Sequence, residues 1–214
     1  MTIVAVDDTD SRERGMCTTY VAVRLAERLE AAGARVRRRL LVRLNPAVKH
    51  KTRGNAAVAL HVTDIDAGAA FALAEETVRE FAAADDPRTS PGVVVADLDV
   101  DGDPFDPASS PIPSAVGEFA RRALRRRLSL AEALTLAEAH GFRHAAFGAG
   151  GSDGNGGSDG DGGDDHVRGR GRIGALAAVG APLAFDDWTV ERISYRELHR
   201  CGTPRDVDVD SAFA

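Results

Sequence analysis

The sequence predicts an α/β fold, and two observations carry that prediction. Short apolar runs such as residues 2–6 and 92–96 are rich in β-branched side chains, which is typical of buried strands. Longer segments such as residues 20–32 repeat apolar side chains about every four positions, which is the spacing of a helix with one buried face. Because such strands and helices alternate along the chain, the helices are expected to cover a sheet.

The first strand is followed by a loop and a helix. Residues 2–6 are almost continuously apolar, as a buried parallel strand would be. After a polar loop, the helix over residues 20–32 has Thr18 and Thr19 at the place of an N-cap, and Gly33 ends it. The junction of strand and helix exposes backbone N–H groups and the positive end of the helix dipole, and this arrangement favours phosphate.

The rest of the chain continues the alternation in two units, residues 1–141 and residues 142–214. The second unit begins as strand, helix and strand, which is the first half of a split βαβ, or ferredoxin-like, domain. Residues 148–166 inside it are mostly Gly, Ser, Asn and Asp, cannot bury apolar area and are expected to form a disordered loop. Further strands are expected over residues 35–44, 56–62, 92–96, 142–147 and 189–195, and further helices over residues 67–84, 116–127, 130–140 and 174–183.

Composition and charge exclude several classes of protein. The 214 residues contain no apolar run of about 18 or more, so we expect no membrane span. The first residues are expected to form a core strand and not a signal peptide. The net charge of −6 does not by itself indicate a nucleic-acid binder. Cys17 and Cys201 match no zinc spacing, so a reduced, cytoplasmic protein is expected.

Three carboxylates, those of Asp7, Asp8 and Asp10, directly follow the first strand. Carboxylates this close repel one another, and a divalent cation would neutralise them. Mg²⁺ prefers one or two carboxylates together with phosphate oxygens, and the strand ends of α/β folds are where ligands bind. We therefore predict that these three residues hold Mg²⁺ and act in catalysis. The alternative is an acidic surface turn, or simple capping of the helix.

The residues at the start of the first helix supply hydroxyl groups and a permissive backbone. Gly15 allows a close backbone approach. Thr18 and Thr19 lie at the positive end of the helix dipole, where one of them could take or hold a phosphoryl group; simple capping is the alternative for both. Cys17 is a candidate nucleophile because a thiol pKa falls at a helix N-terminus, but no sequence pattern pairs it with a histidine.

Two basic segments are candidates for contacts with a triphosphate or with RNA. The only two lysines, Lys49 and Lys51, alternate with Arg53, so the three side chains share one face if the loop is extended. Asn55 follows them, and a solvated basic loop is the alternative. A cluster of five arginines further on forms like-charge pairs along a helix, with RNA or neighbouring acidic loops as the expected partner. These are Arg121, Arg122, Arg125, Arg126 and Arg127.

Taken together, these segments resemble the archaeal tRNA(Ile) 2-agmatinylcytidine synthetases, the TiaS-like enzymes that modify the wobble cytidine of the isoleucine tRNA with a CAU anticodon. The first two matching blocks combined are highly specific, and the similarity runs nearly end to end apart from the Gly- and Asp-rich loop. The matching blocks are residues 7–11 (DDTDS), 15–20 (GMCTTY), 41–46 (LVRLNP), 51–60 (KTRGNAAVAL), 171–180 (GRIGALAAVG) and 193–196 (ISYR).

The resemblance implies a fold and a reaction. Residues 1–141 would be an N-terminal kinase-like α/β domain, and residues 142–214 an incomplete ferredoxin-like segment. With ATP and Mg²⁺ as cofactors, and with tRNA and agmatine as partners, the base carbonyl would be phosphorylated and agmatine joined to carbon 2 of the cytosine. A threonine of the block 15–20 would become phosphorylated, and we assign this role to Thr18. The ATP contacts would come from Ser11, Gly15, Thr19, Lys49, Lys51, Arg53 and Asn55.

The resemblance also implies an OB-fold and a zinc ribbon, which the sequence lacks. The chain is therefore expected to be a truncated form or a catalytic part of such an enzyme. Two other functions stay open. A phosphatase-like hydrolase would use Asp8 as nucleophile and Asp10 as acid/base, as the Asp-x-Asp spacing after a strand suggests. A non-catalytic RNA-binding module would use the arginine clusters.

Overall fold

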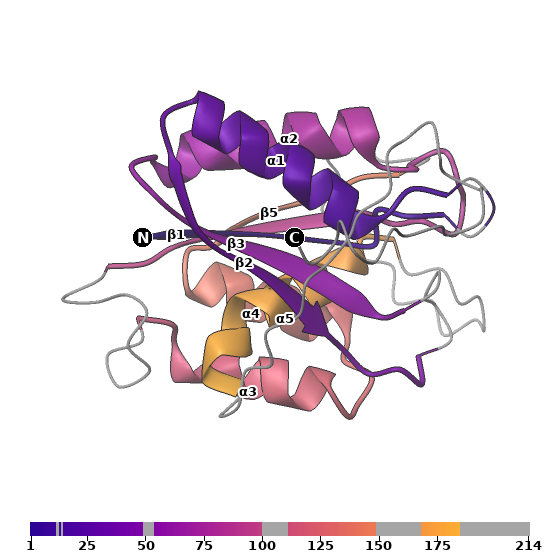
Figure 1. Ribbon diagram of the computed structural model, residues 1–214. Coiled ribbons are helices and arrows are strands. Elements are labelled where there is room, and N and C mark those ends of the chain that lie inside the picture. The colour runs from indigo at the N-terminus through magenta and orange to yellow at the C-terminus, as the bar shows by residue number, and fades with distance from the viewer. Residues whose placement is uncertain (12, 14, 49–53, 100–110, 149–167, 185–214) are drawn as a thin grey trace, which may run out of the picture.

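The computed structural model describes residues 1–184 except residues 12, 14, 49–53, 100–110 and 149–167. A five-stranded sheet lies between two layers of helices, so the molecule has three layers (Figure 1). The order of the strands in the sheet is β2-β3-β1-β4-β5. The predicted α/β fold class is confirmed.

The elements alternate along the chain as predicted. The strands are β1 (Thr2–Asp7), β2 (Arg35–Arg43), β3 (Ala56–Thr63), β4 (Gly92–Asp97) and β5 (Arg143–Ala146). The helices are α1 (Thr18–Ala31), α2 (Ala67–Phe81), α3 (Ser114–Ala123), α4 (Leu130–Ala139) and α5 (Gly171–Ala184). The predicted strand over residues 189–195 and all but the first residue of the predicted disordered loop lie outside the described residues.

Every pair of neighbouring strands in the sheet is antiparallel. The predicted buried strand over residues 2–6 is confirmed, since Ile3, Val4 and Ala5 have no exposed surface, but its predicted parallel pairing is wrong. Helices cover both faces of this sheet, so a central strand is apolar on both sides whichever way its neighbours run. A continuous apolar run therefore reports burial on two faces and not the direction of the strand.

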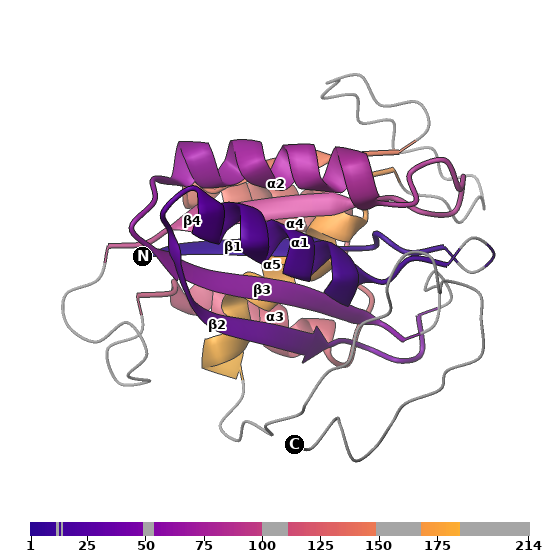
Figure 2. The ribbon, with the colours of Figure 1, turned by 45° about the horizontal axis from the view of Figure 1, so that its top comes forward.

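The first four strands and two helices have a ferredoxin-like arrangement. Their chain order is β1-α1-β2-β3-α2-β4 and their sheet order is β2-β3-β1-β4, which makes two interlocked split βαβ units. Figure 2 shows α1 and α2 side by side on one face of the sheet. Their buried side chains, among them Leu25, Leu29 and Val78, pack against Val4 and Leu60 of the sheet.

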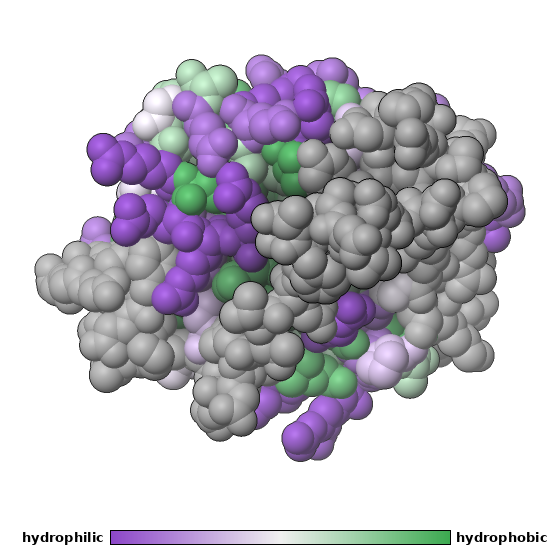
Figure 3. All heavy atoms as spheres, viewed as in Figure 1, coloured by the Kyte–Doolittle hydropathy of each residue, from purple (hydrophilic) through white to green (hydrophobic). Residues whose placement is uncertain are grey.

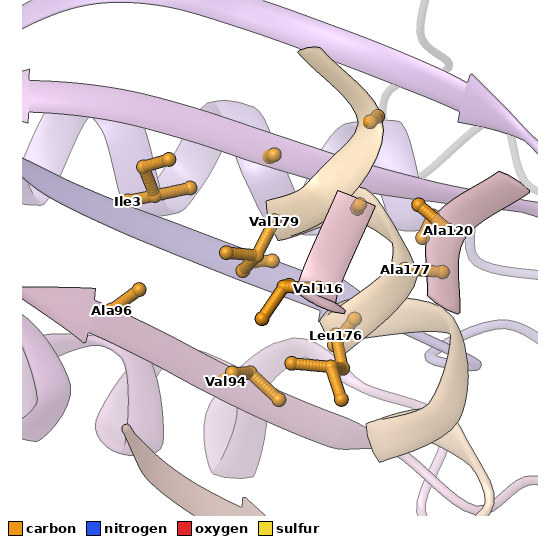
Figure 4. Packing of buried hydrophobic residues seen from close by; sticks show 14 of the residues in the cluster. Ile3, Val94, Ala96, Val116, Ala120, Leu176, Ala177 and Val179 are labelled. Atoms are coloured by element: carbon orange, nitrogen blue, oxygen red, sulfur yellow. The ribbon is translucent and has the colours of Figure 1, made fainter. Parts of the chain in front are cut away.

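Helix α5 forms the centre of the layer on the other face. Six of its residues have no exposed surface, and the helix packs against β1, β3, β4 and α3. Figure 4 shows Leu176 and Val179 of α5 close to Val94 of β4 and Val116 of α3. Gly180 lets two backbones approach, because a Cβ there would lie 2.2 Å from the carbonyl oxygen of Val116. One core therefore joins the first strand of the chain to helix α5.

Strand β5 belongs to the same sheet. It pairs with β4, with Ala146 opposite Gly92. Both β5 and α5 fall in the predicted second unit, residues 142–214, but β5 pairs with β4 of the first unit, and α5 packs against the strands and helices of the first unit. The boundary between two units stays a prediction, because residues 149–167 and 185–214 lie outside the described residues.

On the face of the molecule that carries α1 and β2, many of the residues that are not drawn in grey are hydrophilic, with a few hydrophobic ones between them (Figure 3). β2 is an edge strand, and its residues Arg35, Arg38 and Arg39 are exposed. Arg35 lies 3.2 Å from Asp64 and Arg39 lies 2.8 Å from Glu30, both as exposed ion pairs. Charges on an edge strand discourage pairing with a strand of another chain. None of the helices that the structure describes is both long and apolar enough to cross a membrane.

Candidate active site

Most of the predicted site residues lie at one end of the sheet. β1 ends there at Asp7, β4 begins beside it at Gly92, and helix α5 begins against both. Helix α1 begins at the same end, where its residue Thr18 contacts Thr9. In Figure 1 this end lies on the right, where the loop after β1 emerges from the sheet. The acidic turn of residues 7–11 thus meets the N-termini of two helices.

Asp7 is the last residue of β1 and packs against the first turn of α5. A Cβ at Gly174 would lie 1.8 Å from Oδ2 of Asp7, so the carboxyl group occupies the space that a side chain would need. Burial, and after it the negative charge of Asp8, raise the pKa of Asp7 from 3.8 to about 8. A cation placed at this carboxyl group would favour its ionised form.

Asp8 adopts a left-handed backbone conformation, with a φ of 56°, which is uncommon outside glycine and clusters at functional sites. Its Oδ2 accepts a hydrogen bond from the backbone N–H of Ser90 at 2.9 Å and lies 2.8 Å from Nη2 of Arg170. Burial raises the pKa of Asp8 to about 7, although the charge of Arg170 and the hydrogen bond from Ser90 both lower it. The carboxyl group is therefore held in one orientation from two sides.

The rest of the acidic turn is fixed by the loop between α2 and β4. The carbonyl of Asp10 accepts a hydrogen bond from Oγ1 of Thr89 at 2.8 Å. The buried hydroxyl of Ser11 donates to the carboxylate of Asp86. This hydrogen bond from Ser11, together with contacts from Arg88, holds the pKa of Asp86 below its usual value. Ser11 therefore has a partner within the protein, in addition to its predicted role as an ATP contact.

The two threonines predicted as caps lie inside the first turn of α1. The N-cap is Cys17, whose side chain makes no capping hydrogen bond within the described structure, so the prediction that Thr18 and Thr19 cap the helix is wrong. Oγ1 of Thr18 instead accepts a hydrogen bond from Oγ1 of Thr9 at 3.1 Å in buried surroundings, and Oγ1 of Thr19 lies 3.0 Å from Sγ of Cys17. A first turn without a side-chain cap suits an incoming anion.

Gly15 and Met16 form the bend between the acidic turn and α1. Their φ values are 88° and 66°, so both residues are left-handed. The N–H of Ser11 donates a hydrogen bond to the carbonyl of Gly15 at 2.8 Å and closes this small loop. The glycine predicted to give a close backbone approach therefore also has a conformational requirement, which a larger residue would meet only with strain.

The predicted basic contacts lie mostly outside the described residues. This holds for Lys49, Lys51 and Arg53, whose contacts with phosphate stay predictions. Asn55 closes the base of their loop, because its Nδ2 donates a hydrogen bond to the carbonyl of Asn45 at 2.8 Å. β3 begins directly after this base and runs antiparallel to β1, so the loop leaves the sheet at the same end as the acidic turn.

Three further residues belong to the site although sequence reasoning gave them no role: Ser90, Arg170 and Gly174. They lie about 80 residues or more from the acidic turn in the sequence. Ser90 reaches it because β4 pairs with β1, and Arg170 and Gly174 reach it because the start of α5 lies against both strands. The Gly-Arg run over residues 169–172 is visible in the sequence. Nothing in its spacing, however, connects it with Asp8.

The described residues fit a cation held jointly with phosphate. Among them, no group of three or more His, Cys, Asp or Glu side chains is placed to hold a metal ion alone. Asp7 and Asp8 still supply two carboxyl groups whose ionisation is disfavoured by burial, as their raised pKa values show. Since Mg²⁺ takes one or two carboxylates and completes its shell with phosphate and water oxygens, this pair suits a nucleotide-bound ion.

The hydrolase alternative requires Asp8 to attack phosphorus. In the structure its Oδ2 already faces the Ser90 N–H and the Arg170 guanidinium, and its side chain is 10% exposed. A carboxylate oxygen that is held by two donors is a poor nucleophile, because its lone pairs are occupied. The geometry therefore favours a charge-holding role for Asp8 over nucleophilic attack.

Comparison with known families identifies what the chain is similar to. Residues 3–149 match the family model of the TiaS TCKD domain, and residues 169–214 match that of the TiaS FLD domain. The chain is 49% identical, over 100% of its length, to the tRNA 2-agmatinylcytidine synthetase TiaS of Haloquadratum walsbyi, of which it covers 40%. It is 37% identical, over 98% of its length, to that of Archaeoglobus fulgidus, of which it covers 42%. The chain thus spans about two-fifths of the length of these curated relatives.

Solved structures of TiaS are also similar to this chain. The crystal structure of TiaS in complex with its isoleucine tRNA and ATP matches with a TM-score of 0.73 at 37% identity, over 99% of this chain and 43% of that one. The crystal structure of TiaS with the same tRNA, AMPCPP and agmatine matches with a TM-score of 0.71 at 36% identity, over 99% of this chain and 43% of that one. These matches confirm the fold and the resemblance that the sequence motifs predicted.

Proposed function

The chain belongs to the TiaS family, and we propose that it carries the ATP-dependent chemistry by which agmatine is joined to carbon 2 of the wobble cytidine of the CAU-anticodon isoleucine tRNA. One observation carries the proposal: the acidic turn of residues 7–11 meets the start of α5 through Asp7 and Asp8 and the start of α1 through Thr9, at a single end of the sheet. Because the chain spans two-fifths of its relatives, the substrates and partners of the whole enzyme are proposals for it.

The proposed binding site of the triphosphate lies between the acidic turn and the start of α1. The N–H groups of the first turn and the helix dipole attract phosphate oxygens, and the loop that contains Lys49, Lys51 and Arg53 leaves the sheet at the same end. Asp7, Asp8 and Asp10 are the residues that would hold Mg²⁺ there. When bound, this ion would neutralise charge as the phosphoryl group moves.

The proposed reaction activates a carbonyl group that has a poor leaving group. Transfer of a phosphoryl group from ATP to the oxygen on carbon 2 of the cytosine turns that oxygen into a phosphate ester. The primary amine of agmatine then attacks carbon 2, and the carbon–oxygen bond breaks as phosphate leaves. The base has to leave its stack to reach the site.

Thr18 is the proposed site of protein phosphorylation. The hydrogen bond from Thr9 fixes the position of the Thr18 oxygen at the start of α1, where the dipole stabilises a phosphate group. Thr19 is less buried, and its oxygen contacts Cys17. A cytoplasmic location suits a reaction on tRNA and is part of the same proposal.

The test is incubation of the chain with radiolabelled ATP and Mg²⁺, followed by mapping of the labelled residue. We expect label on Thr18, its loss in Thr18→Val and its retention in the matched Thr19→Val. Absence of label from intact folded protein would count against the proposal, and tRNA binding without nucleotide binding would favour a non-catalytic RNA-binding role. For the complete reaction, agmatine, the isoleucine tRNA and the remaining portion of a full-length relative are added, and agmatinylcytidine is sought by mass spectrometry of nucleosides.

A further inference from the structure

We propose that Arg170 is a positioning residue of this site: its guanidinium group balances the charge of Asp8, so that the start of α5 completes the acidic turn after β1. The inference deepens the proposed function and rests on it, because it concerns the same site. It adds a residue from a part of the chain to which the sequence motifs assigned no chemistry.

The ion pair between Arg170 and Asp8 is largely withdrawn from solvent. Nη2 of Arg170 lies 2.8 Å from Oδ2 of Asp8, and the two side chains are 14% and 10% exposed. The same guanidinium group donates a hydrogen bond to the carbonyl of Arg88. Exposed ion pairs contribute little to the stability of a protein, whereas removal of one partner of a buried pair leaves an uncompensated charge in the interior. The contact therefore has electrostatic consequences for the site.

Ser90 holds both partners of this ion pair in place. Its N–H donates to Asp8 at 2.9 Å. Its hydroxyl accepts a hydrogen bond from the N–H of Gly169 at 2.6 Å, and its carbonyl accepts one from the N–H of Gly171 at 3.1 Å. The residues on either side of Arg170 are thus tied to the residue that orients Asp8. This arrangement fixes the guanidinium group at the acidic turn through the backbone as well as through its own side chain.

The charge of the acidic turn explains why a fixed cation is useful there. Asp7, Asp8 and Asp10 together carry three negative charges when all are ionised, and Arg170 leaves two, which is the charge that one Mg²⁺ ion neutralises. The neighbouring Arg88 pairs with Glu13 and with Asp86. An anionic triphosphate approaching the turn therefore meets less repulsion while Arg170 is in place.

The ion pair also crosses the boundary between the two family matches. Asp8 lies in the segment 3–149 that matches the TiaS TCKD domain, and Arg170 lies in the segment 169–214 that matches the TiaS FLD domain. The second segment therefore contributes a charged side chain to the site of the first. Neither segment alone contains the whole site.

Removal of the charge of Arg170 should change the affinities for a divalent cation and for ATP in opposite directions. Arg170→Gln makes the turn more negative, so it should bind a divalent cation more tightly and ATP more weakly, each by about ten-fold for a charge within several ångströms. Loss of local structure would weaken both ligands. Arg170→Lys retains the charge and should keep both dissociation constants within about three-fold of the wild type.

The experiment uses the complete 214-residue chain. Binding of Mn²⁺ alone is followed by electron paramagnetic resonance, and binding of metal-free ATP by equilibrium dialysis, for the wild type, both Arg170 variants and Arg143→Gln. Arg143 is an exposed arginine on β5 and serves as the matched control, which should leave both constants unchanged.

Opposite shifts in Arg170→Gln, with near-normal binding in Arg170→Lys, support the proposal. Unchanged binding in Arg170→Gln overturns the proposal, and so does weaker binding of both ligands in that variant. A ten-fold change in either dissociation constant in Arg170→Lys also overturns it. If Arg170→Gln does not fold, the result for Arg170→Lys decides. If the wild type binds ATP but not Mn²⁺, the metal part of the proposed function fails and the ATP constants alone decide. If the wild type binds neither ligand, the proposed function itself fails.

Discussion

Oδ2 of Asp7 occupies the space in which a side chain at Gly174 would have to lie. A Cβ at position 174 would stand 1.8 Å from this oxygen and 2.7 Å from Cγ of Asp7. Asp7 cannot withdraw easily, because it is paired with Gly92 at the end of β1. The contact therefore ties the first strand of the chain to the start of α5 at the candidate site.

Gly174→Ala tests this contact. Because one methyl group has to displace either the carboxyl group or the helix, we expect a loss of about 1–3 kcal/mol in the free energy of unfolding, which is typical of overpacking. Gly54→Ala is the matched control, since nothing lies within 4 Å of a Cβ there. Urea unfolding of the two variants measures the difference, and equal effects would show that the packing at Asp7 is loose.

Asp86→Asn tests the support of the acidic turn. The variant weakens the buried hydrogen bond from Ser11, so we expect a loss of about 1–3 kcal/mol in stability at neutral pH. The pKa of Asp86 is lowered in the folded protein, so its contribution is present above the usual carboxyl pKa and is lost as the pH falls through the folded value. The variant and the wild type should therefore converge in acid, while Asp85→Asn, at an exposed neighbour, should stay close to the wild type throughout.

His61 should make stability depend on pH. It lies in β3 opposite Ile3 and is 2% exposed, and burial lowers its pKa from 6.5 to about 4. The unfolded chain therefore binds more protons between these values, so stability is present above about pH 6.5 and is lost as the pH falls towards 4. Between pH 7 and pH 4.5 this loss should be about 2–3 kcal/mol.

The measurement for His61 is urea unfolding at both pH values in the wild type and in His61→Gln. Between pH 7 and pH 4.5 the variant should lose about 2–3 kcal/mol less of its free energy of unfolding than the wild type, because it lacks the imidazole that titrates. His140→Gln, at an exposed histidine, is the control and should keep the slope of the wild type. An unchanged slope in His61→Gln would mean that the ring accepts a proton in the folded state without cost.

Sequence patterns located the elements that burial determines. Apolar runs identify β1, β3 and β4 because helices cover both faces of these strands, and the four-residue repeat identifies α1 because one of its faces contacts the sheet. The sequence patterns placed the start of α1 two residues too late, at Tyr20 instead of Thr18. The apolar repeat begins at Tyr20, whereas the polar residues Thr18 and Thr19 already have helical conformation.

The rest of the candidate site depends on contacts between segments that are distant in the sequence, and these contacts could not be predicted. Asp7, Asp8, Asp10 and the threonines are adjacent in the sequence, so their common location could be predicted from the order of strand, loop and helix. The roles of Ser90 and Arg170 could not be predicted in this way, because Ser90 reaches the turn through the pairing of β4 with β1, and Arg170 through the position of α5 against these strands. A segment of small residues such as 174–183 reveals that a helix packs closely, but not against which strand it packs.

Removal of α5 should abolish the fold and not only the site. A chain that ends at residue 148 loses six fully buried residues of the core and uncovers Ile3, Ala5 and Val94. Because this exposes a large apolar surface, we expect it to bind a hydrophobic dye and to unfold without a cooperative transition. A chain that ends at residue 184 keeps every described element and is the control; cooperative unfolding of the shorter chain would contradict the shared core.

A crystal structure of this chain with AMPCPP and Mg²⁺ would show whether the acidic turn and the start of α1 hold the nucleotide. We expect the triphosphate to lie against the first turn of α1, with the metal ion between its oxygens and the carboxylates of Asp7 and Asp8. A nucleotide bound elsewhere, with Asp8 still facing only Ser90 and Arg170 and no metal ion at the acidic turn, would contradict it.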